Sequence, residues 1–218
     1  ACANEVGICL KTSFEWRHKI LAAIRALEGG ISFSGIVEAD ELLMKYSEKG
    51  RKFKNKEEYQ RAKRKKHPKV AVLVVTDREG NLLFKQVGEK KVKNEQLREE
   101  LKSRLSENNL ICVKPKKEFR KGVKGLQSKK VIVNKRQIKR GIYSVKIVEN
   151  KISDFKTWLS RFHGVATKYL QSYLMWFVIM NKYLKELIDP DIGRLLNLSS
   201  HDRWAWDKYR EIVSQRYD

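Results

Sequence analysis

The sequence has few cysteines and no long apolar run, and each shortage excludes a class of protein. Its three cysteines, Cys2, Cys9 and Cys112, are odd in number and scattered, which excludes a disulfide framework and a paired-cysteine zinc site. No stretch approaches the roughly 18 apolar residues of a membrane-spanning helix, and the most apolar segment, 169–183, contains polar residues. No secretory signal is visible. A reducing, cytoplasmic setting fits these absences.

Acidic residues are also scarce relative to basic ones. The chain of 218 residues has 26 Asp and Glu against 48 Lys and Arg, a formal net charge of +22. Such a charge favours a polyanionic partner, and nucleic acid fits better than a membrane surface. Basic residues form three dense runs, at 61–66, 114–124 and 129–140. Three runs in so basic a chain indicate phosphate contacts rather than a merely solvated face.

The hydrophobic pattern predicts an α/β fold with one sizeable core. Strands are expected at 31–43, 70–76, 82–87, 110–113 and 130–134, and helices at 93–105 and 118–123 and from about 147 onward, with breaks near Gly164 and Pro190. This order is the ribonuclease H-like arrangement, a mixed five-stranded sheet with flanking helices and a helical tail. Its first three strands are antiparallel, and its first and fourth strands lie side by side. The lysine-rich connection 45–69 is expected to be a mobile loop with a short helix.

The first 30 residues predict the end of one helix, a turn at Gly7 and a longer helix. Thr12 or Ser13 is the expected N-cap of that helix. The expected buried stripe is Phe14, Ile20, Leu21, Ile24 and Leu27, and the exposed set includes Lys11, Arg17, His18 and Lys19. The pattern is similar to the second half of a helix-turn-helix, whose second helix enters the major groove of DNA. The predicted DNA contacts are Lys11, Thr12, Ser13, Arg17, His18, Lys19 and Lys168.

We therefore divide the chain into three parts. Residues 1–30 are a helix-turn-helix remnant that binds DNA, residues 31–165 are the ribonuclease H-like core, and residues 166–218 are a C-terminal helical extension. The chain begins with Ala1 rather than Met, which indicates a fragment whose beginning is missing.

Asp40 and Glu149 are the candidate catalytic and metal-binding acids. Asp40 lies on the expected first strand, and Glu149 precedes Lys156 by seven residues on an expected helix. An acid on a central strand, with an acid and a lysine on one helix face, is how polynucleotidyl transferases hold metal ions and DNA. The alternatives are a solvated strand end for Asp40 and ordinary surface charge for the helix pair. Glu38 and Glu41 are expected to be surface charges at the strand end.

A third carboxylate is expected after the fourth strand, but Lys114 stands there. The carboxyl groups of Asp40 and Glu149 are expected to converge in one cleft beside the ammonium of Lys114. A protonated lysine cannot bind a divalent cation, and its charge repels one. Asp77 is the nearest conspicuous alternative, although a turn role explains it better. Glu118 falls on the following helix. The four histidines form no ligand cluster, and the aromatics of 158–177 are typical of core packing.

With these residues, the chain resembles the DDE transposases of small bacterial insertion sequences, in the ISXO2-like, zinc-ribbon branch whose third acid is Glu or Asn followed by a helix lysine. The matching segments are 11–21, 37–41, 76–81 and, most specifically, 161–177, which reads RFHGVATKYLQSYLMWF. The resemblance implies a transposase that cuts DNA at element ends and joins the 3′-hydroxyl to target DNA, using Mg²⁺ or Mn²⁺. It also implies a homo-oligomer on double-stranded DNA in the nucleoid of a bacterial cytoplasm.

By the same resemblance, Asp40 matches the first catalytic acid, Glu149 the third acid and Lys156 the trailing lysine. Lys114 replaces the second acid, and Ser144 and Ile152 replace family histidines. The upstream zinc ribbon is absent, as follows from an N-terminal truncation. These departures predict a DNA transposase that is catalytically impaired. The alternative is a non-catalytic DNA-binding protein derived from a transposase. An RNA-binding module would need exposed aromatics on a sheet face, which the predicted strands almost lack.

Overall fold

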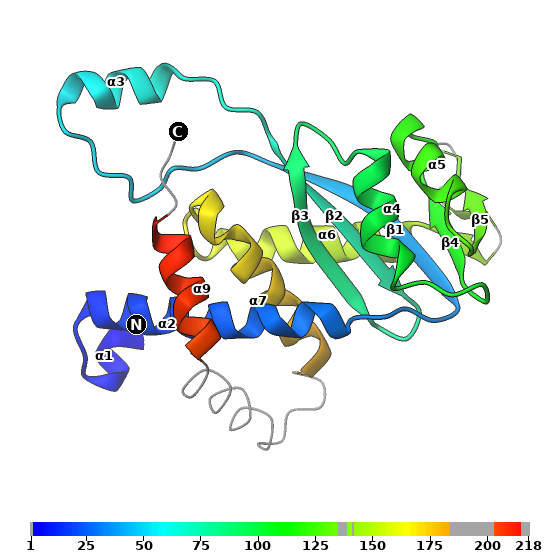
Figure 1. Cartoon of the computed structure of the whole chain (residues 1–218), viewed down its shortest axis with the longest axis horizontal. Coiled ribbons are helices and arrows are strands. Elements are labelled where there is room, and N and C mark those ends of the chain that lie inside the picture. Colours follow the sequence, from blue (N-terminus) through cyan, green and yellow to red (C-terminus); the bar gives the residue numbers. More distant parts are fainter. Residues whose placement is uncertain (1, 135–138, 141, 184–202, 215–218) are drawn as a thin grey trace. The chain divides into compact units, whose positions relative to one another are not determined.

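The computed structural model describes residues 2–134, 139–140, 142–183 and 203–214 (Figure 1). They divide into two compact units. The helical unit comprises Ala1–Gly30 and Lys168–Arg216, and the sheet unit comprises Ile31–Thr167. The expected break near Pro190 and the middle of the basic run 129–140 lie outside the described residues.

The sheet unit contains the predicted five-stranded mixed sheet. Its strands are β1 (Ile36–Met44), β2 (Val70–Asp77), β3 (Leu82–Glu89), β4 (Leu110–Val113) and β5 (Lys129–Ile132). The strand order is β3-β2-β1-β4-β5. β1, β2 and β3 pair antiparallel, whereas β4 runs parallel to both β1 and β5. The ribonuclease H-like topology expected from the sequence is therefore confirmed.

The start of the first strand was predicted too early. Residues 31–35 are not in the sheet: Phe33 donates its backbone N–H to the carbonyl of Arg104, 3.1 Å away. Gly35 then takes a left-handed conformation with φ of 55°, which glycine adopts without steric cost, and the strand begins at the next residue. Ile31 is half-buried and Phe33 is buried, as their apolar character predicts, but they lie in a loop rather than in a strand.

The sheet has two covered faces because strand residues alternate between them. One face carries Val37, Ala39 and Leu73, which pack in one core with Leu97 of α4 (Asn94–Lys102) and Phe119 of α5 (Lys117–Lys124). The other face carries Phe84, which contacts Phe155 of α6 (Lys146–Ser160) at a ring-centroid distance of 5.0 Å. Figure 1 shows α4 and α6 on opposite sides of the strands. β1, at the centre, presents its even-numbered residues to α6.

Two smaller features complete the sheet unit. The connection between β1 and β2 contains α3 (Lys56–Arg64), the short helix expected there. Before α6, the chain forms a two-stranded ladder from β6 (Lys139–Arg140) and β7 (Tyr143–Ser144).

The helical unit consists of α1 (Cys2–Val6), α2 (Leu10–Ile24), the 3₁₀ turn η1 (Arg25–Gly30), η2 (Thr167–Tyr169, whose first residue belongs to the sheet unit), α7 (Leu170–Tyr183) and α9 (Arg203–Ser214). The central helix α2 packs against both α7 and α9. Leu21 and Ile24 are buried as expected, and Ile20 is half-buried. The burial of Leu27 lies outside the described residues. None of the described helices is long and apolar enough to cross a membrane.

Three expectations for α2 are wrong. Its N-cap is Cys9, whose Sγ accepts from the backbone N–H of Thr12 at 3.4 Å, so neither Thr12 nor Ser13 caps the helix. Phe14 is 39% exposed rather than buried, and His18 is 3% exposed rather than facing solvent. The reason is tertiary: the ring of His18 lies against those of Phe14 and Tyr169, at centroid distances of 4.2 and 4.0 Å.

Candidate functional site

The structure brings Asp40, Lys114 and Glu149 together on the α6 side of the sheet. Asp40 lies in the middle of β1, and Lys114 directly follows β4, the parallel neighbour of β1. Glu149 lies in the first turn of α6. Parallel pairing of β1 and β4 therefore places the end of β4 beside Asp40, while α6 packs against β1 from the same face.

The ammonium of Lys114 joins the two acids. Its Nζ lies 2.5 Å from Oδ2 of Asp40 and 2.6 Å from Oε1 of Glu149. The side chain of Asp40 is 5% exposed, that of Lys114 23% and that of Glu149 33%. Burial by itself lowers the pKa of Lys114, but its hydrogen bonds to Asp40 and Glu149 outweigh that effect and raise the pKa above its ordinary value. The lysine is therefore charged at neutral pH.

A second lysine, Lys116, completes the cluster and was not anticipated from the sequence. Its Nζ lies 3.0 Å from Oδ1 of Asp40 and 2.9 Å from Oε1 of Glu41. Each carboxylate oxygen of Asp40 thus has its own ammonium. The one indication in the sequence is Pro115, which lacks a backbone N–H and so ends the strand between the two lysines. Glu41 also accepts from the backbone N–H of Val92 at 3.1 Å, so it is part of this structure rather than a free surface charge.

This arrangement does not fit a divalent cation. Magnesium requires carboxylate oxygens free to bind it at about 2.0–2.1 Å and keeps water and phosphate as further ligands. Here an ammonium lies between the two acids that were predicted to be metal ligands. Among the residues that the structure describes, no group of three or more His, Cys, Asp or Glu could hold a metal ion. The Mg²⁺ or Mn²⁺ expected by resemblance is therefore at odds with the residues present.

Glu38 was expected to be a surface charge, and this is wrong. The residue is 0% exposed, and its Oε2 accepts the backbone N–H groups of Ile147 and Val148 at 2.8 and 3.1 Å. Its Oε1 accepts from Ser144 Oγ at 2.9 Å and lies 3.3 Å from Arg78. A carboxylate at a helix N-terminus binds the unpaired N–H groups and the positive end of the helix dipole. Glu38 therefore fixes the start of α6, the same helical turn that carries Glu149.

The other acids considered have structural roles. Asp77 accepts backbone N–H groups of Ser34, Glu79 and Asn81 at 2.9–3.1 Å, so it holds the β2–β3 turn. It pairs with Val37 in the ladder and therefore faces away from Asp40. Glu118 lies on α5 and forms an ion pair with Lys91.

Lys156, predicted to contact DNA near the cleaved phosphate, is exposed on α6. Seven residues are close to two helical turns, so it lies on the same face of the helix as Glu149. No ion pair of Lys156 is found within the described part of the chain. Its role stays a prediction.

The predicted DNA contacts of the helical unit differ in availability. Lys11 is exposed, whereas the ammonium of Lys19 lies 3.4 Å from the ring centre of Trp206 and Lys168 donates to the carbonyl of Val213 at 3.4 Å. Burial lowers the pKa of Lys168. His18 is buried, so it cannot contact DNA directly in this conformation.

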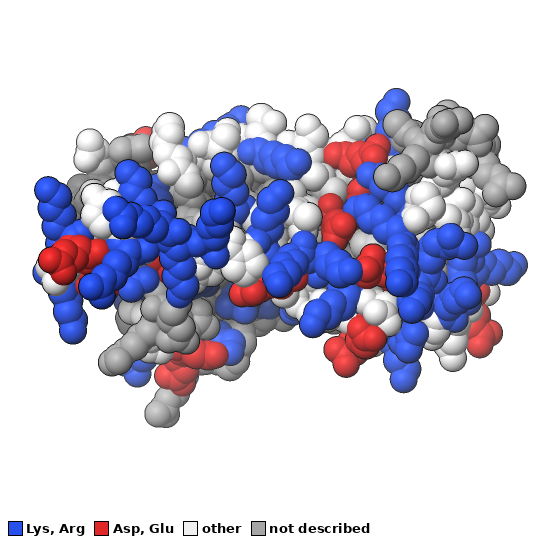
Figure 2. Space-filling model, turned by 90° about the horizontal axis from the view of Figure 1, so that it is seen from above, with Lys and Arg blue, Asp and Glu red and all other residues white. Residues whose placement is uncertain are grey.

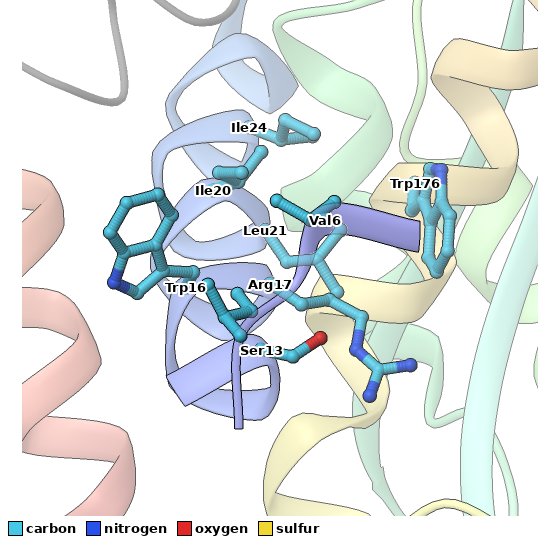
Figure 3. Close-up of a pocket in the computed structure, with 9 residues that line it drawn as sticks. Val6, Ser13, Trp16, Arg17, Ile20, Leu21, Ile24 and Trp176 are labelled. Atoms are coloured by element: carbon cyan, nitrogen blue, oxygen red, sulfur yellow. The ribbon is translucent and has the colours of Figure 1, made fainter. Parts of the chain in front are cut away.

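Thr12 bonds to Cys9 across the start of α2, with 3.1 Å between Oγ1 and Sγ. Ser13 and Arg17 line an apolar pocket of about 330 Å³ within the helical unit. Figure 3 shows Trp16 and Trp176 on opposite sides of that pocket. These contacts leave the helix-turn-helix interpretation a prediction.

The chain was compared with protein families, curated proteins and solved structures. The family model described as ISXO2-like transposase domain matches residues 32–179, more than half of the chain. No match was found among curated proteins. Among solved structures, the chain is similar to one described as a pre-cleavage Mos1 transpososome, with 12% sequence identity and a TM-score of 0.37. That similarity covers 96% of this chain and 65% of the other chain.

Proposed function

Because the chain belongs to the family of ISXO2-like transposase domains, we propose that it is a DNA transposase by descent that binds double-stranded DNA but is impaired in DNA cleavage and joining. The observation that carries the impairment is the position of Lys114, whose ammonium lies within 2.6 Å of both remaining acids.

The physical reason for impairment is competition for the carboxylates. Phosphoryl transfer on DNA by two metal ions needs acids that can bind both ions and so stabilise the attacking and leaving oxygens. A lysine with a raised pKa keeps its proton at neutral pH, and Lys116 neutralises the other oxygen of Asp40. Losing comparable transition-state interactions costs on the order of 10²–10³ in rate.

DNA binding rests on different residues and survives this change. The net charge of +22 supports it, as do the exposed side chains of Lys11 and Lys156. We retain Lys11, Thr12, Ser13 and Arg17 as candidate contacts. We omit the buried His18, and also Lys19 and Lys168, whose ammonium groups contact Trp206 and the carbonyl of Val213. Assembly of several copies on DNA, in the manner of recombinases that act on two ends, is part of the same proposal.

A nicking assay on supercoiled plasmid DNA tests the impairment. With Mg²⁺ or Mn²⁺, the natural chain should nick no faster than a sample without protein. Lys114→Asp, combined with Lys116→Ala to free the second oxygen of Asp40, should nick in a metal-dependent manner. Lys117→Asp, which changes the same charge at an exposed position of α5, is the matched control and should stay inactive. Nicking by the natural chain that Asp40→Ala abolishes would show that the site is intact.

The second candidate is a non-catalytic DNA-binding protein, which the same ion pairs favour. Both readings predict duplex binding that weakens steeply with salt and is indifferent to Asp40→Ala. They differ in the repaired variant. Recovery of nicking supports a transposase with one disabling substitution, whereas inactivity of a folded Lys114→Asp, Lys116→Ala variant supports a protein repurposed for binding.

A further inference from the structure

The connection between β1 and β2, residues 45–69, concentrates the charge of the chain, and we call it the basic arm. It contains 12 Lys and Arg against 3 Glu, a net charge of +9. The whole chain of 218 residues carries +22, so about two fifths of the net charge lies in these 25 residues. Figure 2 shows Lys and Arg side chains gathered over α3 on the face seen from above. A charge density of this kind requires a physical explanation other than solubility.

The basic arm has a defined internal structure. Asn55 caps α3 by accepting the backbone N–H of Glu58 at 2.8 Å. The carboxylate of Glu58 accepts from the backbone of Lys54 at 2.7 Å and from Arg51 at 3.2 Å. The ring of Phe53 lies edge-on to that of Tyr59, with 5.4 Å between centroids. Two of the three acids of the arm, Glu48 and Glu58, therefore form ion pairs with the same cation, Arg51.

The helix of the arm directs its cations outward. No residue of α3 is buried, so the helix contributes nothing to the core. Glu58 and Ala62, four residues apart, are its half-buried positions, and they face the interior of the arm. The exposed cations of the helix and its end, which make no ion pair among the described residues, are Lys56, Arg61, Lys63, Arg64 and Lys66. Since these cations are exposed and face away from the arm's interior, they are available to an anionic partner.

The base of the arm is fixed to the turn that follows α6. Lys49 donates its ammonium to the carbonyls of Phe162, His163 and Gly164 at 3.2, 2.9 and 2.9 Å. The backbones of Ser47 and Thr167 are also joined, since the N–H of Thr167 donates to the carbonyl of Ser47 at 2.8 Å. The arm therefore begins directly after β1, the strand that carries Asp40, and its base is held by the turn that follows α6.

From these observations we propose that the basic arm binds the phosphate backbone of duplex DNA, holding it alongside the Asp40–Lys114–Glu149 cluster. The proposal rests on the proposed DNA-binding function and assigns a surface to it. The contacts are to phosphate rather than to bases, because lysines and arginines on one exposed helix face match a line of anions without a fixed pattern of donors. The basic run at 114–124 makes a smaller contribution, since two of its lysines are engaged with the acids.

The test compares two variants that lose the same charge. The arm variant carries Arg61→Gln, Lys63→Gln, Arg64→Gln and Lys66→Gln. The control carries Lys117→Gln, Lys121→Gln, Lys124→Gln and Lys129→Gln, four exposed lysines of α5 and β5 in the same unit. Binding of the full chain to a 30-base-pair duplex of arbitrary sequence is measured by fluorescence anisotropy from 50 to 300 mM salt, and melting temperatures check folding.

If the arm holds the DNA, its variant loses about 3–4 units of the slope of log K against log salt and on the order of a hundredfold in affinity near 0.1 M salt. The control should keep most of the natural slope. Equal losses in both variants, or a larger loss in the control, would overturn the arm proposal while leaving DNA binding in place. Failure of the natural chain to bind duplex DNA in a salt-dependent way would instead overturn the proposed function.

Two further probes separate other polyanions from duplex DNA. Double-stranded RNA and vesicles containing phosphatidylserine are used as competitors at equal charge. Duplex DNA should compete best, and the arm variant should lose this preference. Stronger displacement by the vesicles would overturn the assignment in favour of a membrane surface.

Discussion

Replacing Lys114 with methionine should destabilise the sheet unit, because it removes the cation between two acids. Met keeps most of the aliphatic stem and deletes the charge, so the change isolates the ion pairs. The exposed fractions of Lys114, Asp40 and Glu149 are 23%, 5% and 33%. Breaking a fully buried pair costs about 3–5 kcal/mol, and breaking an exposed pair costs about 0–1 kcal/mol.

The magnitude falls between these limits. Lys116 still contacts Asp40 in the variant, and Glu149 gains access to water, so we expect a loss of about 2 kcal/mol. For a unit of this size, each kcal/mol shifts the melting temperature by roughly 3–5 °C, which gives a fall of about 6–10 °C. Lys117→Met, at an exposed position of α5, is the control and should change the melting temperature by less than about 2 °C.

Adding Mg²⁺ distinguishes a lysine that occupies the site from one that merely lies near it. The melting temperature of the natural chain should be the same in EDTA and in millimolar Mg²⁺, because Asp40 and Glu149 are already paired with ammonium groups. Lys114→Asp should be less stable than Lys114→Met in EDTA, since three carboxylates then repel one another, and Mg²⁺ should raise its melting temperature. The reasoning is refuted if Lys114→Met melts like the natural chain, or if Mg²⁺ stabilises the natural chain as much as Lys114→Asp.

Three further changes test other parts of the structure. Burial lowers the pKa of His18 to about 4, so the helical unit should be fully stable above pH 6.5 and lose roughly 3 kcal/mol as pH falls to 4; His18→Phe should remove this dependence in urea titrations. Glu38→Ala leaves two N–H groups of α6 without an acceptor and should cost about 2–4 kcal/mol by urea unfolding, with Glu38→Gln costing less. Gly122→Ala places a Cβ 2.9 Å from Leu97 and 3.1 Å from the carbonyl of Asn94, so overpacking should exceed the gain in helix propensity and lower the melting temperature by several degrees.

Glu38 and Asp40 show how far the pattern of a single strand reaches. Both lie on the same face of β1, two residues apart, which the alternation of the strand predicts. The sequence predicts the ammonium of Lys114 beside Asp40, but it indicates neither the second ammonium there, that of Lys116, nor the contact of Glu38 with the N-terminus of α6. Those partners come from residues more than 70 positions away, and only the packing of α6 and the end of β4 brings them there.

His18 and Phe14 show the same limit in a helix. They lie four residues apart and so share one face of α2, which the helical period fixes. Which of the two is buried depends on where Tyr169 packs, and that residue lies more than 150 positions downstream. Local periodicity predicts that a helix face is apolar, but it cannot predict which residues of that face another segment of the chain covers.

The order of strands and helices, the ribonuclease H-like topology and the family could be predicted from the sequence, because these follow from periodicity, turn residues and matching segments of the chain. Only folding showed that the ammonium of Lys114 forms ion pairs with both Asp40 and Glu149, that Lys116 joins them, and that Glu38 is buried at a helix end. The physical reason is that topology follows from local preferences summed along the chain. The protonation and partners of a side chain depend instead on groups within a few ångströms, and those are brought together only by folding.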